Sequence, residues 1–157
     1  MQLTSSAFQA GAEIPAHYTG DGKNVSPELS WKDAPAETKS FALIVHDPDA
    51  PRPGGFTHWV VYNISPQTGH LEEHVPEGRE IAGIGMQGRN DAGKVGYMGP
   101  APPSGVHRYF FRLYALDSFL DLEPGASHKE VTAAMQGHIL AQTDLMGTYE
   151  RKSKRVA

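Results

Sequence analysis

The sequence predicts a mostly antiparallel β fold with one main accessory helix near the C-terminus. Three runs rich in β-branched and aromatic residues, each bounded by proline, glycine or aspartate, indicate strands, whereas one segment alone has the signals of a long helix. The 157 residues include 17 glycines and 12 prolines, a proportion that favours tight turns between short strands over a helical bundle. Regular alternation of strands and helices is absent, which argues against a Rossmann fold or an α/β barrel.

The length of the chain suits one domain, which we place at residues 1–150, followed by a basic tail at residues 151–157. The absence of cysteine excludes disulfide scaffolds, thiol catalysis and cysteine-ligated metal sites. The net charge is −4 although the tail is basic, so the rest of the chain is more acidic still, and we expect no nucleic-acid partner. Neither a signal sequence nor a membrane-spanning run is recognisable, so we expect a cytoplasmic protein without integral membrane association.

The strands are predicted in three strong runs, at residues 41–46, 58–64 and 107–116. Weaker strand candidates lie at residues 29–31 and 147–149.

A helix is predicted over residues 128–142. Ser127 followed by Glu130 has the spacing of a capping box. Apolar positions from Val131 to Leu145 then recur on or near one helical face, and Gly147 is the expected stop.

Two proline-rich loops, residues 47–55 and 96–105, are where we expect function. Each contains three prolines, and such segments resist both helix formation and strand pairing. A rigid loop loses little conformational entropy when it binds a ligand.

Three familiar patterns are weak here. The segment Gly83-Ile-Gly-Met-Gln-Gly88 matches the dinucleotide fingerprint, but no convincing strand precedes it and a turn follows where a helix should begin. Ser104 and His107 allow a hydrolase triad, although no nucleophile elbow surrounds the serine. The same loops supply possible zinc or manganese ligands, and spacing alone does not decide between a metal site and an anion site: His58, His107, Asp47 and Asp49.

Read together, the two loops and the strands after them resemble the phosphatidylethanolamine-binding protein family, also known as the Raf kinase inhibitor proteins. The first motif is Asp47-Pro-Asp-Ala-Pro51 followed by His58-Trp59, and the second runs from Gly96 through the proline-rich loop to His107-Arg-Tyr109. Further similarity lies in Asn24-Val-Ser-Pro27 and in the C-terminal segment ending at Glu150, which is similar to the compact bacterial and archaeal branch. The resemblance spans roughly residues 2–150.

The resemblance implies a β-sandwich with a small anion-binding pocket at one end, and neither a metal nor another cofactor. The ligand-binding residues that it implies are Asp47, Asp49, His58, Tyr97, Gly99, Ala101, His107 and Tyr109. Pro51, Pro102 and Pro103 would shape the pocket walls. The family also suggests a cis peptide bond before a loop proline, for which Ala50–Pro51 is the candidate.

The chemistry of these residues suits a phosphate or a carboxylate. His58 and His107 can donate hydrogen bonds when protonated, and at least one of the two aspartates is expected to hold an imidazole rather than face the anion. We therefore expect a small phosphorylated or carboxylated ligand and an inhibitory or regulatory role. The alternatives are a kinase or serine protease inhibitor that acts by surface docking, and a hydrolase. A monomer and a homodimer both remain open.

Overall fold

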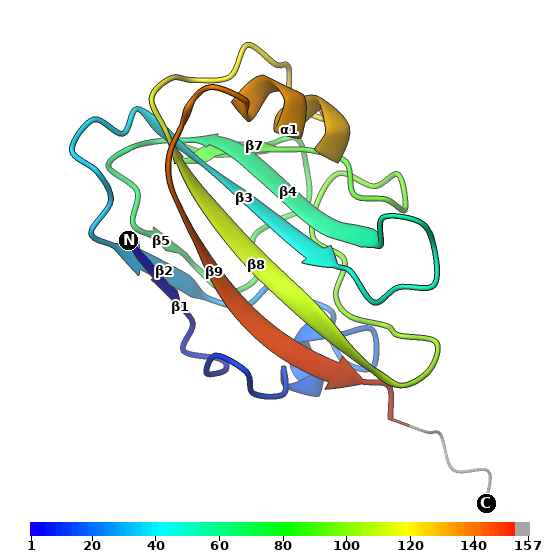
Figure 1. Ribbon diagram of the computed structural model, residues 1–157. Coiled ribbons are helices and arrows are strands. Elements are labelled where there is room, and N and C mark those ends of the chain that lie inside the picture. The colour runs from blue at the N-terminus through cyan, green and yellow to red at the C-terminus, as the bar shows by residue number, and fades with distance from the viewer. Residues whose placement is uncertain (153–157) are drawn as a thin grey trace, which may run out of the picture.

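The structure is a computed structural model that describes residues 1–152. Two antiparallel sheets pack face to face, and a short helix covers part of the outer face of the larger sheet (Figure 1). The mostly β fold with one helix near the C-terminus is therefore confirmed. Within residues 1–152, no helix has the length and apolar character needed to cross a membrane.

The larger sheet contains all three strongly predicted strands, each extended by one or two residues. In spatial order its six strands are β6 (Glu80–Ile81), β7 (Gly85–Gln87), β4 (Phe56–Ile64), β3 (Ser40–Asp47), β8 (Val106–Leu116) and β9 (Ile139–Glu150). The glycine-rich segment at residues 83–88 thus forms strand β7 and its preceding turn rather than a nucleotide-binding loop.

The smaller sheet has the order β1 (Gln2–Thr4), β2 (Leu29–Lys32) and β5 (His70–Leu71). Strand β2 was the weaker prediction at residues 29–31. A single 3-10 turn, Ala16–Tyr18, lies in the segment that joins β1 to β2.

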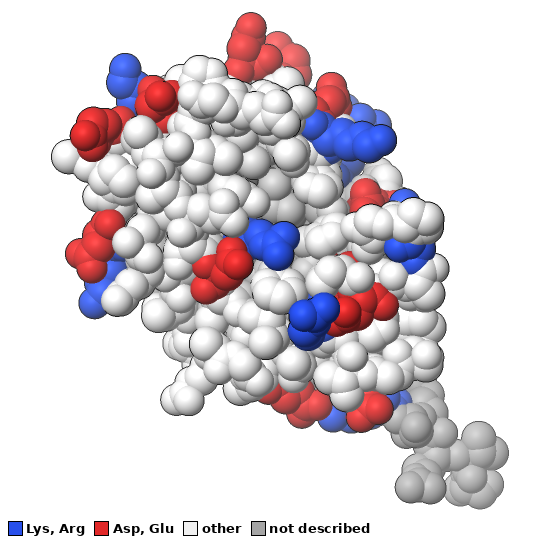
Figure 2. Space-filling view, viewed as in Figure 1, with Lys and Arg blue, Asp and Glu red and all other residues white. Residues whose placement is uncertain are grey.

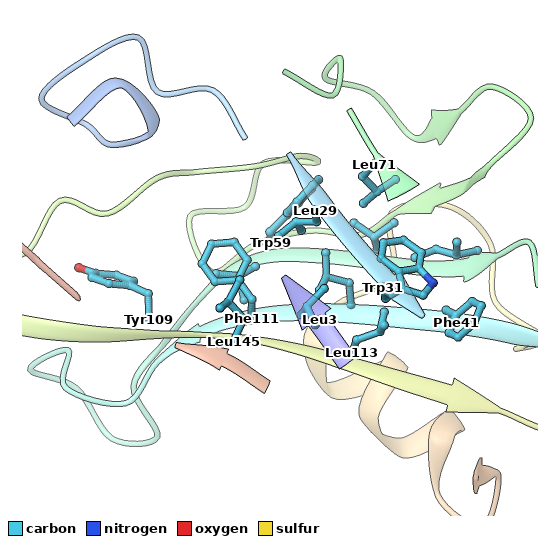
Figure 3. Close-up of a cluster of buried hydrophobic side chains, with 14 of the residues drawn as sticks. Leu3, Leu29, Trp31, Phe41, Trp59, Leu71, Tyr109, Phe111, Leu113 and Leu145 are labelled. Atoms are coloured by element: carbon cyan, nitrogen blue, oxygen red, sulfur yellow. The ribbon is translucent and has the colours of Figure 1, made fainter. Parts of the chain in front are cut away.

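The main core fills the space between the two sheets. Strands β2 and β8 alternate buried side chains with more exposed ones, whereas the central strands β3 and β4 are buried on both faces. The side chains that point between the two sheets meet in one cluster (Figure 3). Its fully buried members include Leu29, Trp59, Phe111 and Leu113. A second cluster lies between the outer face of the large sheet and helix α1 (His128–Met135), where Val131 and Met135 are buried.

The prediction of a helix as far as residue 142 is wrong. The capping box of Ser127 and Glu130 is present, but α1 ends at Met135, and Gly137 adopts a left-handed φ of 83°. The chain then continues as β9, the longest strand, with Leu145, Gly147 and Tyr149 buried in alternation. Of the apolar residues that extend the predicted helical stripe, Leu145 is an inward side chain of this strand, and Ile139 at its start is exposed.

Gly147 is required for packing and not for ending a helix. A Cβ atom at this position would lie 2.6 Å from Ile14 Cγ1 and 2.8 Å from Phe8 Cε2. The strand therefore passes close to the N-terminal segment, which also pairs with its edge through Glu13 and Thr148.

The predicted cis bond between Ala50 and Pro51 is also wrong, since none of the peptide bonds in residues 1–152 is cis. The loop instead reverses direction at Gly54 and Gly55, which adopt φ values of 80° and 77°. Of the predicted basic tail, residues 153–157 lie outside the described part of the chain.

Candidate ligand pocket

A small pocket lies at the end of the sandwich where β3 ends and β4 and β8 begin. Figure 1 shows the arrangement of these strands. Its volume is about 180 Å³, which corresponds to roughly six water molecules at about 30 Å³ each. The pocket is thus sized for a headgroup or a small anion. Its lining consists of Asp47, Ala50, Pro51, Arg52, Phe56, His58, Met98, Ala101, Pro102, Pro103, His107 and Tyr109.

Asp47 and His107 form a buried pair at the base of the pocket. Nδ1 of His107 lies 2.6 Å from Oδ2 of Asp47, and the other carboxylate oxygen accepts the backbone N–H of Asp49 at 2.7 Å. Because an ionised carboxylate only accepts, the proton between the two side chains is assigned to Nδ1 of His107. Nε2 is therefore the nitrogen that His107 has available for a ligand.

His58 is fixed in the same way by a different partner. Its Nδ1–H donates to the backbone carbonyl of Met98 at 2.7 Å, which again leaves Nε2 for the pocket. Burial lowers the pKa of His58, and the hydrogen bond to Met98 and the charge of Asp47 oppose that shift in part. Nε2 of His58 is therefore a bare acceptor at neutral pH and becomes a donor when the ring gains a proton.

Tyr109 lies between the two imidazoles. Its ring meets His58 edge-on with centroids 5.3 Å apart and stacks on His107 at 6.4 Å. Figure 3 shows the hydroxyl pointing away from the rest of the core cluster, and it is buried without a hydrogen-bond partner among residues 1–152. Burial, followed by the charge of the Asp47 carboxylate and a hydrogen-bond interaction with it beyond ordinary hydrogen-bond distance, raises the pKa of Tyr109, so the group stays a protonated donor.

The lining includes residues that were not predicted. Arg52 stands over the ring of Phe56 with 5.4 Å between its guanidinium carbon and the ring centroid, and it is exposed at the pocket. It follows Pro51 directly, so its position in the first proline-rich loop was the available signal. Met98 also lines the pocket, and its backbone carbonyl accepts the hydrogen bond from His58.

Asp49 was predicted as a pocket residue but faces another way. Its two carboxylate oxygens each accept a hydrogen bond from the Arg108 guanidinium at 2.9 Å, and one also accepts the backbone N–H of Arg108. These hydrogen bonds lower the pKa of Asp49 to about 2. The negative charge of Asp49 is thus paired outside the pocket lining.

Tyr97 and Gly99 also lie outside the lining, and both hold the second loop against the N-terminal segment. The Tyr97 hydroxyl donates to the backbone carbonyl of Tyr18 at 2.6 Å, and the backbone N–H of Gly99 donates to Oδ1 of Asn24 at 2.8 Å. A Cβ at Gly99 would lie 2.3 Å from the Tyr18 carbonyl oxygen, so only glycine fits there. The N–H of Gly99 is therefore used within the protein.

Backbone donors are correspondingly few along this wall. Pro100, Pro102 and Pro103 have no N–H, so Ala101 is the residue of this stretch that can offer one to a ligand. The side chains of His58, His107 and Tyr109 are then the main candidate donors.

The competing chemistries find less support in the geometry. Within residues 1–152, no group of three or more His, Asp or Glu side chains is placed to hold a metal ion. Ser104 is exposed and lines a neighbouring hollow instead of the pocket, so it does not approach His107 as a nucleophile would. On the face seen in Figure 2, acidic and basic side chains are interspersed and form no basic surface for nucleic acid.

Comparison with known proteins shows what the chain is similar to. The family model described as phosphatidylethanolamine-binding protein matches residues 4–150. A UPF0098 protein from Methanothermobacter thermautotrophicus is 55% identical over 151 residues, covering 96% of this chain and 99% of the relative. One from Aquifex aeolicus is 53% identical, covering 96% and 89% of the two chains.

Solved structures agree with that similarity. The crystal structure of a phosphatidylethanolamine-binding protein homologue from Chlamydia trachomatis has a TM-score of 0.87 and 46% identity, covering 96% of this chain and 97% of that one. Escherichia coli YbcL, described as a member of the mammalian family, has a TM-score of 0.88 at 33% identity, covering 96% and 98%.

Proposed function

Since the chain belongs to the phosphatidylethanolamine-binding protein family, we propose that its pocket binds a small anion, either a phosphate headgroup or another phosphorylated ligand. We further propose that the output of binding is regulatory or inhibitory. The observation that carries the proposal is the arrangement of the two histidines. The Nδ1 of each ring is hydrogen-bonded within the protein, and its Nε2 is available to a ligand in the pocket.

This arrangement predicts pH-dependent binding. When either ring is neutral, its Nε2 has a lone pair that repels an anion, and protonation turns the same atom into a charged donor. The Tyr109 hydroxyl, buried and without a partner among residues 1–152, adds a neutral donor, and Arg52 adds positive charge at the mouth. The buried carboxylate of Asp47 is the opposing charge, and its two oxygens are already occupied by the N–H groups of His107 and Asp49.

Isothermal titration with sulfate between about pH 8 and about pH 5 tests the proposal, because sulfate keeps its charge across this range. The range extends well below the ordinary histidine pKa of about 6.5 because burial lowers the pKa of His58. We expect affinity to rise as the pH falls. His107→Gln and His58→Gln should each flatten that rise and weaken binding at pH 6 by about tenfold or more, the usual worth of a charged hydrogen bond. His138→Gln is the matched control, since His138 pairs with the exposed Asp117.

An affinity that stays level from about pH 8 to about pH 5 in the unmodified protein would rule out the histidines as partners of the anion. A docking inhibitor of a kinase or serine protease is a second proposal that the same titration does not exclude. It requires inhibition to survive Tyr109→Phe and His107→Gln, because the pocket would then be secondary. A hydrolase would instead show turnover that is lost in Ser104→Ala.

A further inference from the structure

A second polar cluster lies behind the pocket, on the outer face of the same strand ends. The hydroxyl oxygen of Thr57 is 3.0 Å from Nδ1 of His46 and 3.0 Å from Nδ1 of His128. The two imidazole centroids are 5.7 Å apart. Thr57 is fully buried, and both histidines are half-buried.

A single hydroxyl proton constrains both rings. The buried hydroxyl proton needs an acceptor, and the partners of this oxygen among residues 1–152 are the two Nδ1 atoms. The hydroxyl therefore donates to one Nδ1 and accepts an N–H from the other. The cluster accommodates two neutral rings of opposite tautomer, or one charged and one neutral ring. Two charged rings would leave the hydroxyl proton without an acceptor and bring like charges together.

The surroundings favour His128 as the ring that stays neutral. His128 is the first residue of α1, where the helix dipole disfavours a positive charge. Burial lowers the pKa of His128, charges on His46 and Arg112 lower it further, and the carboxylate of Asp91 opposes them. His46 is then the ring that donates Nδ1–H to Thr57, and it can take up a proton at Nε2 without breaking the cluster.

The cluster is connected to the pocket through two peptide units. Successive side chains in a strand point to opposite faces of the sheet. His46 and Thr57 therefore point to the outer face, and the residues that follow them, Asp47 and His58, point to the pocket. His46 and Thr57 are also paired across β3 and β4. The turn residue Asp91 closes the arrangement, because its carboxylate accepts the Thr57 N–H at 2.7 Å and its own N–H donates to the Thr57 carbonyl.

We propose that His46, Thr57 and His128 form a proton-binding site on the back of the pocket, and that a proton held there opposes the protonation of His58. Around the cluster, the charged and titratable groups are Arg112 from β8 and Asp91 from the turn. Around His58 they are Asp47 and His46 from β3, Asp91 from the turn, His107 and Tyr109 from β8, and Arg52 from the first proline-rich loop. The effect of this proton-binding site on ligand binding rests on the proposed anion-binding function. The pH at which His58 gains its charge is then shifted in part from the opposite face of the sheet.

NMR spectroscopy of the full chain labelled with ¹⁵N-histidine tests the proposal without any ligand. At pH 7.5 we expect His128 to carry its proton on Nε2 and His46 to carry its proton on Nδ1. In His46→Gln, the midpoint for titration of His58 should move to higher pH, because the opposing charge is gone. His138→Gln, which removes an exposed histidine, should leave the His58 titration unchanged.

Thr57→Val supplies a second variant of nearly the same shape. It should abolish the opposite tautomers of His46 and His128 while the hydrogen bond from His58 to Met98 persists. Identical tautomers in the unmodified protein, tautomers that survive Thr57→Val, or a His58 titration unchanged in His46→Gln would each overturn the proposal.

A parallel titration with sulfate separates this inference from the proposed function. If sulfate binds, the midpoint of His58 should rise further, since a bound dianion favours the charged ring. If sulfate fails to bind at any pH, the anion-binding function is wrong, while the titrations recorded without sulfate still decide whether His46 acts on His58.

Discussion

Oδ2 of Asp47 lies 2.6 Å from Nδ1 of His107, although the two residues are 60 positions apart in the chain. Both side chains are almost fully buried, with exposed fractions of 2% and 6%. The contact joins the end of β3 to the start of β8, so the pair both closes the end of the large sheet and orients the imidazole that lines the pocket.

Asp47→Asn should damage stability and ligand binding together. An asparagine has one acceptor oxygen, which cannot serve both the His107 N–H and the Asp49 N–H. We expect a loss of about 1.5–3 kcal/mol in the free energy of unfolding at pH 7, as for a buried charged hydrogen bond, and a flatter pH dependence of sulfate binding. Urea unfolding measures the first effect and calorimetry the second.

The matched control is Asp117→Asn, which removes an exposed carboxylate 2.8 Å from Nδ1 of His138. Its cost should stay below about 1 kcal/mol, the range of exposed pairs. Equal losses in the two variants would mean that burial does not strengthen the Asp47–His107 contact.

Tyr109→Phe should stabilise the free protein and weaken the site. The buried hydroxyl has no hydrogen-bond partner at ordinary distance among residues 1–152, although it interacts with the Asp47 carboxylate at longer range, so deleting it should raise the free energy of unfolding by up to about 1 kcal/mol. Sulfate affinity should fall about tenfold if the hydroxyl donates to the anion. Urea unfolding and calorimetry on the same preparation measure the two changes.

Tyr62→Phe is the control, because the same substitution at this position should lower the free energy of unfolding. The Tyr62 hydroxyl donates to the Glu123 carbonyl and accepts the Ala126 N–H at 3.1 Å, so its removal should cost about 1–3 kcal/mol and leave sulfate binding intact. Destabilisation by Tyr109→Phe would contradict the view that the Tyr109 hydroxyl makes no stabilising hydrogen bond in the free protein.

Gly99→Ala should destabilise the loop that forms one wall of the pocket. The new methyl group would meet the Tyr18 carbonyl oxygen at 2.3 Å and Cα of Thr19 at 2.9 Å, and backbone atoms cannot move aside cheaply. We expect a cost of about 1–3 kcal/mol in thermal or urea unfolding. Gly69→Ala, which meets one atom at 3.3 Å, should be far milder, and a similar cost for both would show that the contact at Gly99 is not limiting.

Asp49→Asn should change the acid stability of the protein. The folded pKa of about 2 lies below the ordinary 3.8, so the unfolded chain binds the proton first as pH falls. The stabilisation from Asp49 is therefore complete above about pH 5 and is lost progressively as the pH falls through the folded pKa of about 2. Because its partner Arg108 is half exposed, the difference between the two proteins at pH 7 should be below about 1 kcal/mol.

Urea unfolding of both proteins at pH 7 and near pH 2 measures that difference. It should shrink at the lower pH, and a difference that is the same at both pH values would mean that the Arg108 contact does not depend on the charge of Asp49.

The strands could be predicted because their sequences agree with their surroundings. Residues 41–46 and 58–64 are almost continuously buried, and β-branched residues bounded by turn formers signal that state directly. The segment after Met135 was harder, because apolar side chains at 139, 141 and 145 suit both a helical stripe and a strand. Gly137 is the residue within the predicted helical span that argues against a continuous helix, because glycine is a poor helix former and readily adopts the left-handed φ that it has here.

The site could be predicted in part for a related reason. Asp47, His58 and His107 stand at junctions of strands and loops, and the resemblance to a family drew attention to them. The sequence could not distinguish a side chain that lines the pocket from one that supports it, since Tyr97 and Gly99 find their partners in Tyr18 and Asn24, more than 70 positions away. The ligand-binding role of Tyr97 and Gly99 stays a prediction, and their hydrogen bonds indicate that they hold the pocket wall in place.

The hold of the N-terminal segment on the second loop has a consequence for the order of folding. Tyr18 and Asn24 bind residues 97 and 99, and the Gly20 N–H donates to the Pro100 carbonyl, so one wall of the pocket depends on contacts between distant parts of the chain. Closing such long loops is slow compared with pairing neighbouring strands. The cavity should therefore be among the last features to form during refolding, and a bound anion would favour the state in which the early and late halves of the sequence have met.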